Sequence, residues 1–378
     1  MPYAIGIDAR KLFDFGIGTY IKHLIEALAA IDAENRYFLL TTGEGRDALS
    51  HLPENFKPVV ERSQVYSLSE LLRVSQKLRR LGVDLYHSTH YVLPAFLPCP
   101  AVATIHDIIH LLYPDFLPNR LALLYAQRMM RSTLSRAERI LTVSRNTKSD
   151  LMEFFEVDPT KIEVVYNGVD DRFRGRLDPA EIDQRLARLG VSRPYLLFVG
   201  NPKPHKNLNT VIQAYAHALS VAPFEEPLVC VGAREGAEFK LRQRAEHLGI
   251  GDRLKLVGYV DDADLPALYQ GATLFLYPTL YEGFGLPVAE AMASGTAVVT
   301  SNTSALREIA EGYAYLVDPH DVARMGEAIA VCVSDPERRA GLAELGLRRA
   351  GEFRWQKAAE ETLAVYRRAL EGRKASRP

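Results

Sequence analysis

Two glutamates stand on either side of a predicted helix start, and they are the residues best placed to do chemistry. Residues 274–277 are apolar and indicate a buried strand, and a glycine-flanked loop then leads into a helix over 287–295. Unpaired N–H groups and the positive end of the helix dipole favour a phosphate there. Glu282 precedes this position and Glu290 follows it, so their carboxylates can accept hydrogen bonds from hydroxyls on both sides of a diphosphate. A nucleotide-sugar carries hydroxyls in both places.

Acidic residues near a helix start also stabilise the helix without a ligand, so the glutamates alone leave a structural role open. A basic loop supplies an independent signal. It follows the predicted strand 195–199 and ends at Lys206, just before a helix that begins at Asn207. A cation and backbone amides can share a diphosphate at such a helix start. A solvated basic turn is the structural alternative.

Two further predicted strands end at residues that could line a binding site. The first strand is followed by Gly16 and Gly18, which match half of a dinucleotide-binding fingerprint. A plain tight turn would use the same glycines. The strand over 101–105 ends at His106 and Asp107, where buried chain reaches the edge of a sheet. We expect this histidine to be functional rather than structural.

Short apolar segments alternate with amphipathic helices along the whole chain, which predicts an α/β fold with parallel sheets covered on both faces. Ten strands exceed what one such sheet usually contains, so we expect two doubly wound, Rossmann-like domains facing a cleft. The break follows the turn signal at 167–168 and gives domains over 1–172 and 173–354. The predicted strands are 4–7, 37–40, 84–87, 101–105, 139–143, 195–199, 228–231, 253–257, 274–277 and 297–300, with helices that include 19–30, 119–136, 207–220 and 265–270.

Composition excludes several classes of protein. The 378 residues include 46 basic and 47 acidic ones, so a net charge of −1 gives no overall field that would attract nucleic acid. Cys99, Cys230 and Cys332 are far apart and lie among apolar or small residues, which predicts buried thiols in a reducing compartment. The N-terminus reaches Asp8 too early for a signal peptide, and no apolar stretch approaches the ~20 residues of a membrane span. We therefore expect a cytoplasmic protein.

The sequence of residues 282–295, Glu-Gly-Phe-Gly-Leu-Pro-Val-Ala-Glu-Ala-Met-Ala-Ser-Gly, resembles the donor-site signature of the retaining GT-B glycosyltransferases of family GT4. The likeness extends over nearly the whole chain. It implies a GT-B fold and transfer of a sugar from a nucleotide-sugar donor. It also implies that Glu290 holds the ribose, that Lys206 contacts the diphosphate, and that Glu282 and His106 position the sugar.

The same resemblance implies donor contacts from the backbone. The loop at Gly258 and Tyr259 would hold the nucleobase, and the loop at Gly16 and Gly18 would approach the phosphates and sugar. The diphosphate would accept hydrogen bonds from the amides of Phe284, Gly285 and Leu286.

The chain departs from the family in the basic loop. The family often has an arginine just after the glycine that ends the strand, and Asn201 stands there instead. Lys203 or His205 could supply the missing charge, and the sequence does not distinguish them. Because a charge-assisted contact is worth about 1.5–3 kcal/mol, its loss would weaken donor binding without abolishing it.

Acceptor-side residues are expected in the first domain. His87 and His90 follow the strand at 84–87 and are candidates together with Asp107. The resemblance also implies that the last helix, over 355–372, returns to pack on the first domain. Trp355 would anchor this helix, with an ordinary core role as the alternative.

No metal or other cofactor is expected. Asp262 and Asp264 match the Asp-x-Asp pattern that other glycosyltransferases use for a metal, but they precede a helix and fit its N-cap and first turn better. The resemblance implies that helix dipoles and basic residues take the place of a metal.

Basic residues cluster in two helical stretches of the first half, 67–80 and 119–148. Amphipathic basic helices can lie on anionic membranes, and a solvated helix face is the alternative. Membrane contact would suit a lipid-linked acceptor.

The sequences around Lys206 and His106 resemble those of bacterial mannosyl- and rhamnosyltransferases of polysaccharide assembly. This resemblance implies GDP-mannose as the donor and a saccharide or lipid-linked saccharide as the acceptor. UDP- and dTDP-sugars stay open. A nucleotide-sugar epimerase could share the fold, as could a phosphorylase, which needs a cofactor lysine that we do not find. A non-enzymatic two-domain binding protein would not need Glu282 together with Lys206.

Overall fold

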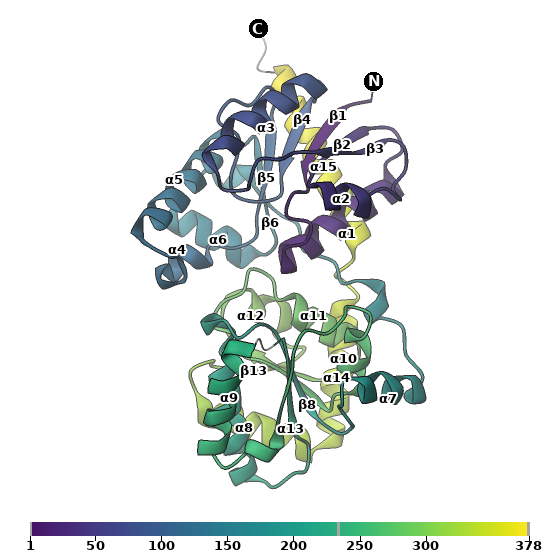
Figure 1. Ribbon diagram of the computed structural model, residues 1–378, viewed down its shortest axis with the longest axis vertical. Helices are drawn as coiled ribbons and strands as arrows, with labels where there is room; N and C mark the ends of the chain where they lie inside the picture. The colour runs from purple at the N-terminus through teal and green to yellow at the C-terminus, as the bar shows by residue number, and fades with distance from the viewer. Residues whose placement is uncertain (1, 233–234, 376–378) are drawn as a thin grey trace. The chain divides into compact units, whose positions relative to one another are not determined.

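The computed structural model describes residues 2–232 and 235–375, and the described chain forms two compact units. The N-terminal unit comprises the residues up to Gly168 together with those from Arg354 onward. The C-terminal unit comprises Val169–Phe353 (Figure 1). The sequence placed this boundary at 172/173 and the returning helix at 355–372.

A parallel sheet of seven strands forms the centre of the N-terminal unit, in the order β3-β2-β1-β4-β5-β6-β7. The strand order reverses between β1 and β4, and ligands of such sheets bind at the carboxyl ends of the strands near this point. Every residue of β1, β4 and β5 is buried, which explains why β1 and β5 consist mostly of apolar residues. The strands are β1 Ala4–Asp8, β2 Arg36–Thr41, β3 Phe56–Val60, β4 Leu85–Ser88, β5 Ala101–Ile105, β6 Arg139–Thr142 and β7 Ile162–Val164.

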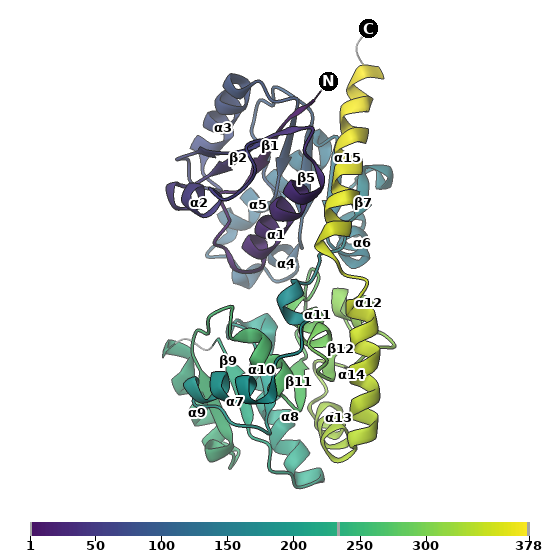
Figure 2. The ribbon, with the colours of Figure 1, turned by 90° about the vertical axis from the view of Figure 1, so that its right-hand side faces the viewer.

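Helices cover this sheet, and the last helix of the chain is one of them. In Figure 2, α15 runs alongside the N-terminal sheet, where it packs on α1 and contacts β4 and β5. The ring of Trp355 at its start stacks on His23 at 5.4 Å. The helices are α1 Phe15–Ile31, α2 Gly43–Ala48, α3 Leu68–Leu81, α4 Ile109–Leu112, α5 Arg120–Arg136, α6 Arg145–Phe154 and α15 Trp355–Ala375.

The C-terminal unit repeats the plan with six parallel strands in the order β10-β9-β8-β11-β12-β13. Its strand order reverses between β8 and β11, so the loops after these two strands lie at the expected ligand edge. The strands are β8 Leu196–Val199, β9 Leu228–Val231, β10 Leu254–Val257, β11 Leu274–Tyr277, β12 Val298–Ser301 and β13 Tyr315–Val317.

The helices of the C-terminal unit include one closely packed pair, α11 and α14, in which Gly346 faces Met292. A side chain at position 346 would place its Cβ 3.1 Å from Met292 Cγ, so glycine allows the close approach. The helices are α7 Pro179–Arg188, α8 Leu208–Val221, α9 Glu235–His247, α10 Leu265–Gly271, α11 Leu286–Ala293, α12 Ser304–Ala310, α13 Val322–Ser334 and α14 Pro336–Ala350.

The predicted fold class, two Rossmann-like parallel sheets, is confirmed. All ten predicted strands are present, and the three strands that the sequence did not reveal, β3, β7 and β13, lie at sheet edges. The three cysteines are buried and form no disulfide, as predicted. Among the helices of the described residues, none combines the length and apolar character needed to cross a bilayer.

Candidate active site

Three side chains meet at the carboxyl edge of the C-terminal sheet. Lys206 Nζ lies 2.6 Å from Glu282 Oε1 and donates a hydrogen bond to Tyr277 Oη at 2.7 Å. Tyr277 Oη in turn donates to the same carboxylate oxygen at 3.1 Å. The lysine comes from the loop after β8, and the tyrosine ends β11, so the topology that places these strands side by side assembles the cluster. The structure thus brings the predicted Lys206 and Glu282 together.

Tyr277 keeps its proton in this cluster. Burial raises the pKa of its hydroxyl well above the usual value, and the neighbouring Glu282 charge raises it further. The side chains of Lys206 and Glu282 are only 16% and 13% exposed, so solvent screens their attraction less than it would at an open surface. The cluster therefore holds one cation and one carboxylate in fixed positions, with a neutral hydroxyl between them.

Two strained residues hold the loops that carry the cluster. Ser304 has a φ of 52° and its Oγ accepts a hydrogen bond from the Glu282 N–H at 3.1 Å. Asn207 has a φ of 59°, and its side-chain amide donates to the carbonyls of Pro278 at 3.0 Å and Pro319 at 2.7 Å. Left-handed backbone costs a non-glycine residue of order 1 kcal/mol, and such residues concentrate at functional sites.

The helix start after Glu282 has the form that the sequence predicts. Gly285 adopts a φ of 97°, and a Cβ there would lie 2.4 Å from Leu306 Cδ2, so only glycine fits. α11 then begins at Leu286. Within the described chain, the backbone N–H groups of Gly285 and Leu286 donate to no acceptor. Phe284 is buried and packs edge-on against Phe353 at 5.3 Å. The amides at this helix start are therefore available to an anion.

Glu290 lies one turn inside α11 and is mostly buried. Its Oε2 accepts a hydrogen bond from Tyr269 Oη at 3.1 Å. Burial raises the pKa of Glu290 to about 7, although the Tyr269 hydrogen bond and the charge of Arg172 act in the opposite direction. Near neutral pH this carboxyl group can therefore accept a hydrogen bond from a hydroxyl or donate one.

The loop after β8 corrects one expectation. Burial lowers the pKa of His205 to about 4, with the Lys206 charge adding to the effect, so this ring is neutral at pH 7 and does not supply the missing cation. Lys203 is exposed. The side-chain oxygen of Asn201 is buried and has no hydrogen-bond partner among the described residues, so it is available as an acceptor for a ligand N–H or O–H.

The remaining predicted donor residues of this unit are more exposed. Gly258 follows β10, and its carbonyl accepts a hydrogen bond from Gly232 N–H at 3.0 Å. Tyr259 is 82% exposed.

The two aspartates of the Asp-x-Asp pattern both lie near arginines. Asp262 Oδ2 is 3.6 Å from Arg172 Nη2. Asp264 occupies the N-cap position of α10 as predicted, but its side chain makes no capping hydrogen bond and faces an arginine instead.

In the N-terminal unit, the two glycines of the fingerprint-like segment lie inside a helix. α1 begins at Phe15, four residues before the predicted start, so Gly16 and Gly18 belong to its first turn rather than to a loop. A Cβ at Gly18 would lie 2.3 Å from the Leu12 carbonyl oxygen, which requires glycine. A Cβ at Gly16 would meet open space.

His106 is held in one tautomer at the end of β5. Its Nε2 lies 3.0 Å from the Thr89 carbonyl oxygen and must therefore carry the proton, which leaves Nδ1 as an acceptor. Its ring packs edge-on against Tyr20 at 4.8 Å. Burial lowers the pKa of His106 to about 4, so the ring is neutral at pH 7. Asp107 Oδ1 accepts a hydrogen bond from Ile109 N–H at 3.0 Å at the start of α4.

The two acceptor-side histidines are core residues, which corrects the sequence-based expectation. His87 is fully buried between Tyr366 Oη and Thr104 Oγ1, each 2.7 Å from a ring nitrogen. Burial lowers the pKa of His87 to about 3. His90 is 2% exposed, and its Nε2 lies 3.4 Å from Asp8 Oδ2. Neither ring is accessible to an acceptor.

Asp8 and Glu70 lie close enough to His90 to suggest a metal site, but an arginine stands between them. Arg10 Nη2 is 2.5 Å from both Asp8 Oδ2 and Glu70 Oε1. Burial alone would raise the pKa of Asp8. The charge of Arg10 outweighs that effect, so the pKa of Asp8 lies well below its usual range. The guanidinium thus occupies the position that a cation would take, and the cluster is an ion-pair network.

Comparison with known proteins identifies the family. Residues 16–173 match the family model described as Glycosyltransferase Family 4, and residues 181–349 match the one described as Glycosyl transferases group 1. The O-antigen chain mannosyltransferase B of Escherichia coli is 31% identical over 305 residues, which cover 80% of this chain and 79% of that protein. The chain belongs to the family 4 glycosyltransferases.

Other relatives of the glycosyltransferase agree with this assignment. The MMP alpha-(1->4)-mannosyltransferase of Mycolicibacterium hassiacum is 33% identical over 64% of this chain and 57% of that protein. The crystal structure of Anabaena HepE in complex with UDP and glucose aligns with a TM-score of 0.77 and 20% identity, over 96% of this chain and 99% of that one. The structural likeness supports the GT-B fold.

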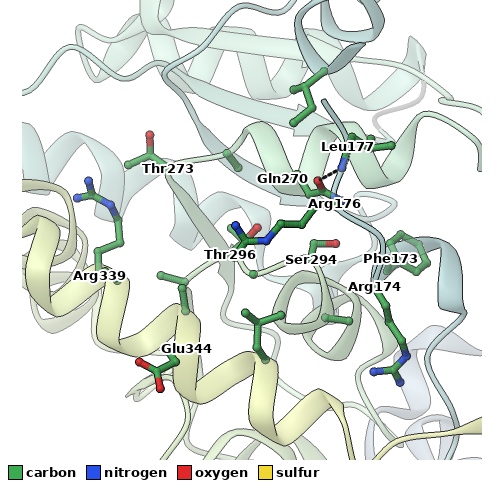
Figure 3. A pocket seen from close by; sticks show the side chains of 18 of the residues that line it. Phe173, Arg174, Arg176, Leu177, Gln270, Thr273, Ser294, Thr296, Arg339 and Glu344 are labelled. Carbon is green, nitrogen blue, oxygen red and sulfur yellow. Dashed lines mark hydrogen bonds between the residues drawn. The ribbon is translucent and has the colours of Figure 1, made fainter. Parts of the chain in front are cut away.

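Figure 3 shows a cavity of about 640 Å³ in the glycosyltransferase. Its lining places it at the opposite sheet edge from the Lys206 cluster. Thr273 and Ala297, the residues before β11 and β12, line it. Figure 3 shows Gln270 at its wall, where Oε1 accepts a hydrogen bond from Leu177 N–H at 3.0 Å. None of the predicted donor residues lines this cavity, so we do not assign it to the donor.

Sequence reasoning missed three residues of the candidate site. Tyr277 ends a correctly predicted strand, so its place at the carboxyl edge could have been inferred from the sequence. Tyr269 contacts Glu290 from α10, and Ser304 holds Glu282 from α12. No local pattern distinguishes these two from ordinary helix residues, because their roles depend on packing between distant segments.

Proposed function

We propose that the chain is a retaining, metal-independent hexosyltransferase that moves mannose from GDP-mannose to a saccharide or lipid-linked saccharide. The cluster of Lys206, Glu282 and Tyr277 beside the start of α11 carries this proposal. The names of the Escherichia coli and Mycolicibacterium hassiacum relatives support the sugar. UDP- and dTDP-sugars are the competing donors.

The diphosphate would bind at the start of α11. The N–H groups of Gly285 and Leu286 and the helix dipole would bind its oxygens, and Lys206 would contribute a full positive charge. Departure of the nucleoside diphosphate leaves negative charge on the β-phosphate. Fixed donors that neutralise this charge in a site with little water give the largest catalytic effect in many enzymes. The proposal needs no metal, because the lysine and the amides supply this charge.

The two carboxyl groups would recognise the sugars on either side of the diphosphate. Glu290 would bind the ribose hydroxyls, with Tyr269 fixing its orientation at 3.1 Å. Glu282 would accept hydrogen bonds from hydroxyls of the transferred sugar. His106 of the N-terminal unit would contact the same sugar through its unprotonated Nδ1.

The reaction would proceed on one face of the sugar. The bond between the anomeric carbon and the β-phosphate oxygen breaks, and a bond forms between that carbon and the acceptor oxygen. The proton of the acceptor hydroxyl passes to the departing phosphate. No side chain acts as nucleophile in this scheme, so positioning and charge neutralisation provide the rate enhancement.

Membrane contact is a further part of the proposal. On α5, Leu121 and Leu124 are 76% and 56% exposed, and Arg128 and Arg131 continue the same helix face. Exposed leucines next to arginines suit insertion into an anionic lipid surface. Replacement of both leucines by serine should reduce co-sedimentation with phosphatidylglycerol vesicles. Equal co-sedimentation of the variant and the wild type would contradict this part.

A thermal-shift series tests the donor assignment. GDP, UDP and dTDP would be compared at about 100 times the Kd of the best binder, where binding adds about 2.7 kcal/mol of stability. For a unit of this size that corresponds to a rise in Tm of about 5 °C or more. We expect GDP to give the largest shift. The Lys206→Met variant should lose most of it, whereas Lys357→Met, at an exposed lysine of α15 in the other unit, should retain it.

Product analysis tests the stereochemistry. The enzyme would be incubated with GDP-mannose and methyl α-mannopyranoside, and the anomeric configuration of the new linkage would be read by NMR. An α-linked product supports retention, because the donor is α-configured. A β-linked product would refute the proposed single-face reaction.

A further inference from the structure

A basic depression lies at the carboxyl ends of β2 and β3 in the N-terminal unit. Two cavities of about 620 and 420 Å³ share Val60, Glu61 and Arg62 in their walls and therefore adjoin each other. We call them together the β2/β3 depression. Its charged lining comes from α2, α3 and the loops that follow β1 and β3; these residues are Arg10, Arg46, Glu61, Arg62, Arg73, Lys77 and Arg80.

The charge of this lining is unusual for the chain. Six basic residues and one acidic residue line the depression, whereas the whole sequence has 46 basic and 47 acidic residues. Lys77 is neutralised by Glu61 at 3.1 Å, and Arg10 is neutralised beneath the surface by Asp8 and Glu70. Three of the remaining guanidinium groups form no ion pair with a carboxylate of the described residues; they belong to Arg62, Arg73 and Arg80.

The loop that carries Arg62 is fixed by its neighbours on both sides. The N–H and Oγ of Ser63 donate to Glu61 Oε1, each at 2.9 Å. Arg10 Nη1 donates to the Ser63 carbonyl at 3.2 Å, and Lys77 Nζ donates to the Val60 carbonyl. The backbone of residue 62 is therefore held between anchored residues. A guanidinium on a fixed loop loses less conformational entropy when it binds a ligand than one on a mobile loop.

The wall opposite this loop is one face of α3. Arg73, Lys77 and Arg80 are spaced by four and three residues, so their side chains lie on the same side of the helix. Guanidinium groups match the oxygens of phosphate with paired hydrogen bonds. The depression is large enough for a phosphorylated sugar or a diphosphate. It lies at the carboxyl edge of the sheet, the edge at which α/β sheets bind ligands, on the β2/β3 side of the switch point between β1 and β4.

We propose that the β2/β3 depression binds a phosphate group of the acceptor. This inference rests on the proposed glycosyl transfer, in which the donor diphosphate is held in the C-terminal unit. Arg62, Arg73 and Arg80 are exposed, so water satisfies them in the absence of a ligand. A neutral saccharide would make no use of their charge, whereas a phosphate monoester or a diphosphate would form charge-assisted hydrogen bonds with them. The acceptor class is thus a phosphorylated compound, and its phosphate belongs either to a sugar phosphate or lipid-linked diphosphate, or to a phospholipid headgroup.

Isothermal titration of the full chain with inorganic pyrophosphate tests this inference. We expect two sites in the wild type, one in each unit. The double variant Arg62→Gln/Arg80→Gln should raise the Kd of one site about tenfold, since each lost charge-assisted contact is worth about a factor of ten before solvent screening. Arg79→Gln is the matched control, because Arg79 is an exposed residue of α3 that lines neither cavity.

The Lys206→Met variant separates this inference from the proposed function. It should lose the other pyrophosphate site and keep the one that depends on Arg62 and Arg80. If Arg62→Gln/Arg80→Gln binds pyrophosphate with wild-type affinity and stoichiometry, the inference is wrong, even where Lys206→Met confirms the donor site. If Lys206→Met binds pyrophosphate like the wild type while Arg62→Gln/Arg80→Gln weakens one site, the donor assignment fails and the phosphate site in the N-terminal unit stands.

Vesicle binding distinguishes the two sources of phosphate. Wild type, Arg79→Gln and the double variant would be sedimented with phosphatidylcholine vesicles, with and without phosphatidylglycerol. A preference for phosphatidylglycerol that the double variant loses assigns the phosphate to a lipid headgroup. Equal sedimentation of all three proteins, combined with the loss of one pyrophosphate site, assigns it to a sugar phosphate or lipid-linked diphosphate.

Discussion

Replacing Glu290 by glutamine should stabilise the protein at alkaline pH while damaging donor binding. The carboxyl group is mostly buried in α11, and its direct hydrogen-bond donor is Tyr269 Oη. Glutamine has nearly the same shape, and its side-chain oxygen can accept the same hydrogen bond. The substitution therefore removes a charge that burial disfavours and keeps the packing.

The size of the effect follows from the pKa. Burial raises the pKa of Glu290 from 4.5 to about 7, so the folded protein holds a proton that the unfolded chain has lost between these values. Stability contributed by this group therefore falls as the pH rises through this window. A pKa shift of this size lowers the free energy of unfolding by about 3 kcal/mol above pH 7. The Glu290→Gln variant should gain little near pH 4.5 and up to about 3 kcal/mol at pH 8.

Differential scanning calorimetry between pH 4.5 and 8.5 would measure this effect as the Tm difference between variant and wild type. Other titrating groups cancel in that difference. About 3 kcal/mol corresponds to roughly 6 °C or more for a unit of this size. Glu344→Gln, at an exposed glutamate of the same unit, is the control for the loss of one carboxylate. A Tm difference for Glu290→Gln that does not change with pH would show that the folded protein does not destabilise this charge, and would refute the reasoning.

Three further predictions concern ion pairs. Lys206→Met should lower kcat/KM for the donor by about 10- to 100-fold in steady-state assays, because one charge-assisted contact to the diphosphate is lost. Glu282→Gln should weaken binding of the nucleotide-sugar but strengthen binding of the free nucleoside diphosphate, because it removes a negative charge that repels the diphosphate beside Lys206. Calorimetric titration of both ligands would show whether the two affinities change in opposite directions. Arg10→Met should destabilise the N-terminal unit by about 3–5 kcal/mol, because it leaves Asp8 buried without its counter-charge, and an unchanged Tm would contradict this account of the network.

The sequence predicted central strands better than edge strands. β1 and β5 are buried along their whole length, so they consist mostly of apolar residues and were found with nearly correct bounds. β3 contains a lysine and Pro58, and most of its residues are only partly buried. An edge strand has one unpaired side, so it tolerates proline and polar residues and lacks the pattern that identifies a strand.

The candidate site was predictable where one short segment contains both the chemistry and its geometry. The segment from Glu282 to Glu290 includes the loop, the required glycine at 285 and the helix start. Roles set by packing were not predictable. His87 lies near the carboxyl end of β4, as a ligand-binding residue could, yet its ring faces Tyr366 of the last helix, 279 residues away in sequence. No local pattern distinguishes a strand-end histidine that binds a ligand from one that is buried in the core.

The pairing of Lys206 with Glu282 has a consequence for how a donor would be recognised. A diphosphate that binds at the start of α11 must share Lys206 with Glu282, which lies 2.6 Å from it. The diphosphate then weakens the attraction that neutralised the glutamate, and the carboxylate needs new hydrogen-bond donors. Hydroxyls of an attached sugar would supply them, whereas a free nucleoside diphosphate would not. In the proposed donor complex, this ion pair would therefore favour a complete nucleotide-sugar over its own leaving group, which would promote release of the nucleoside diphosphate after transfer.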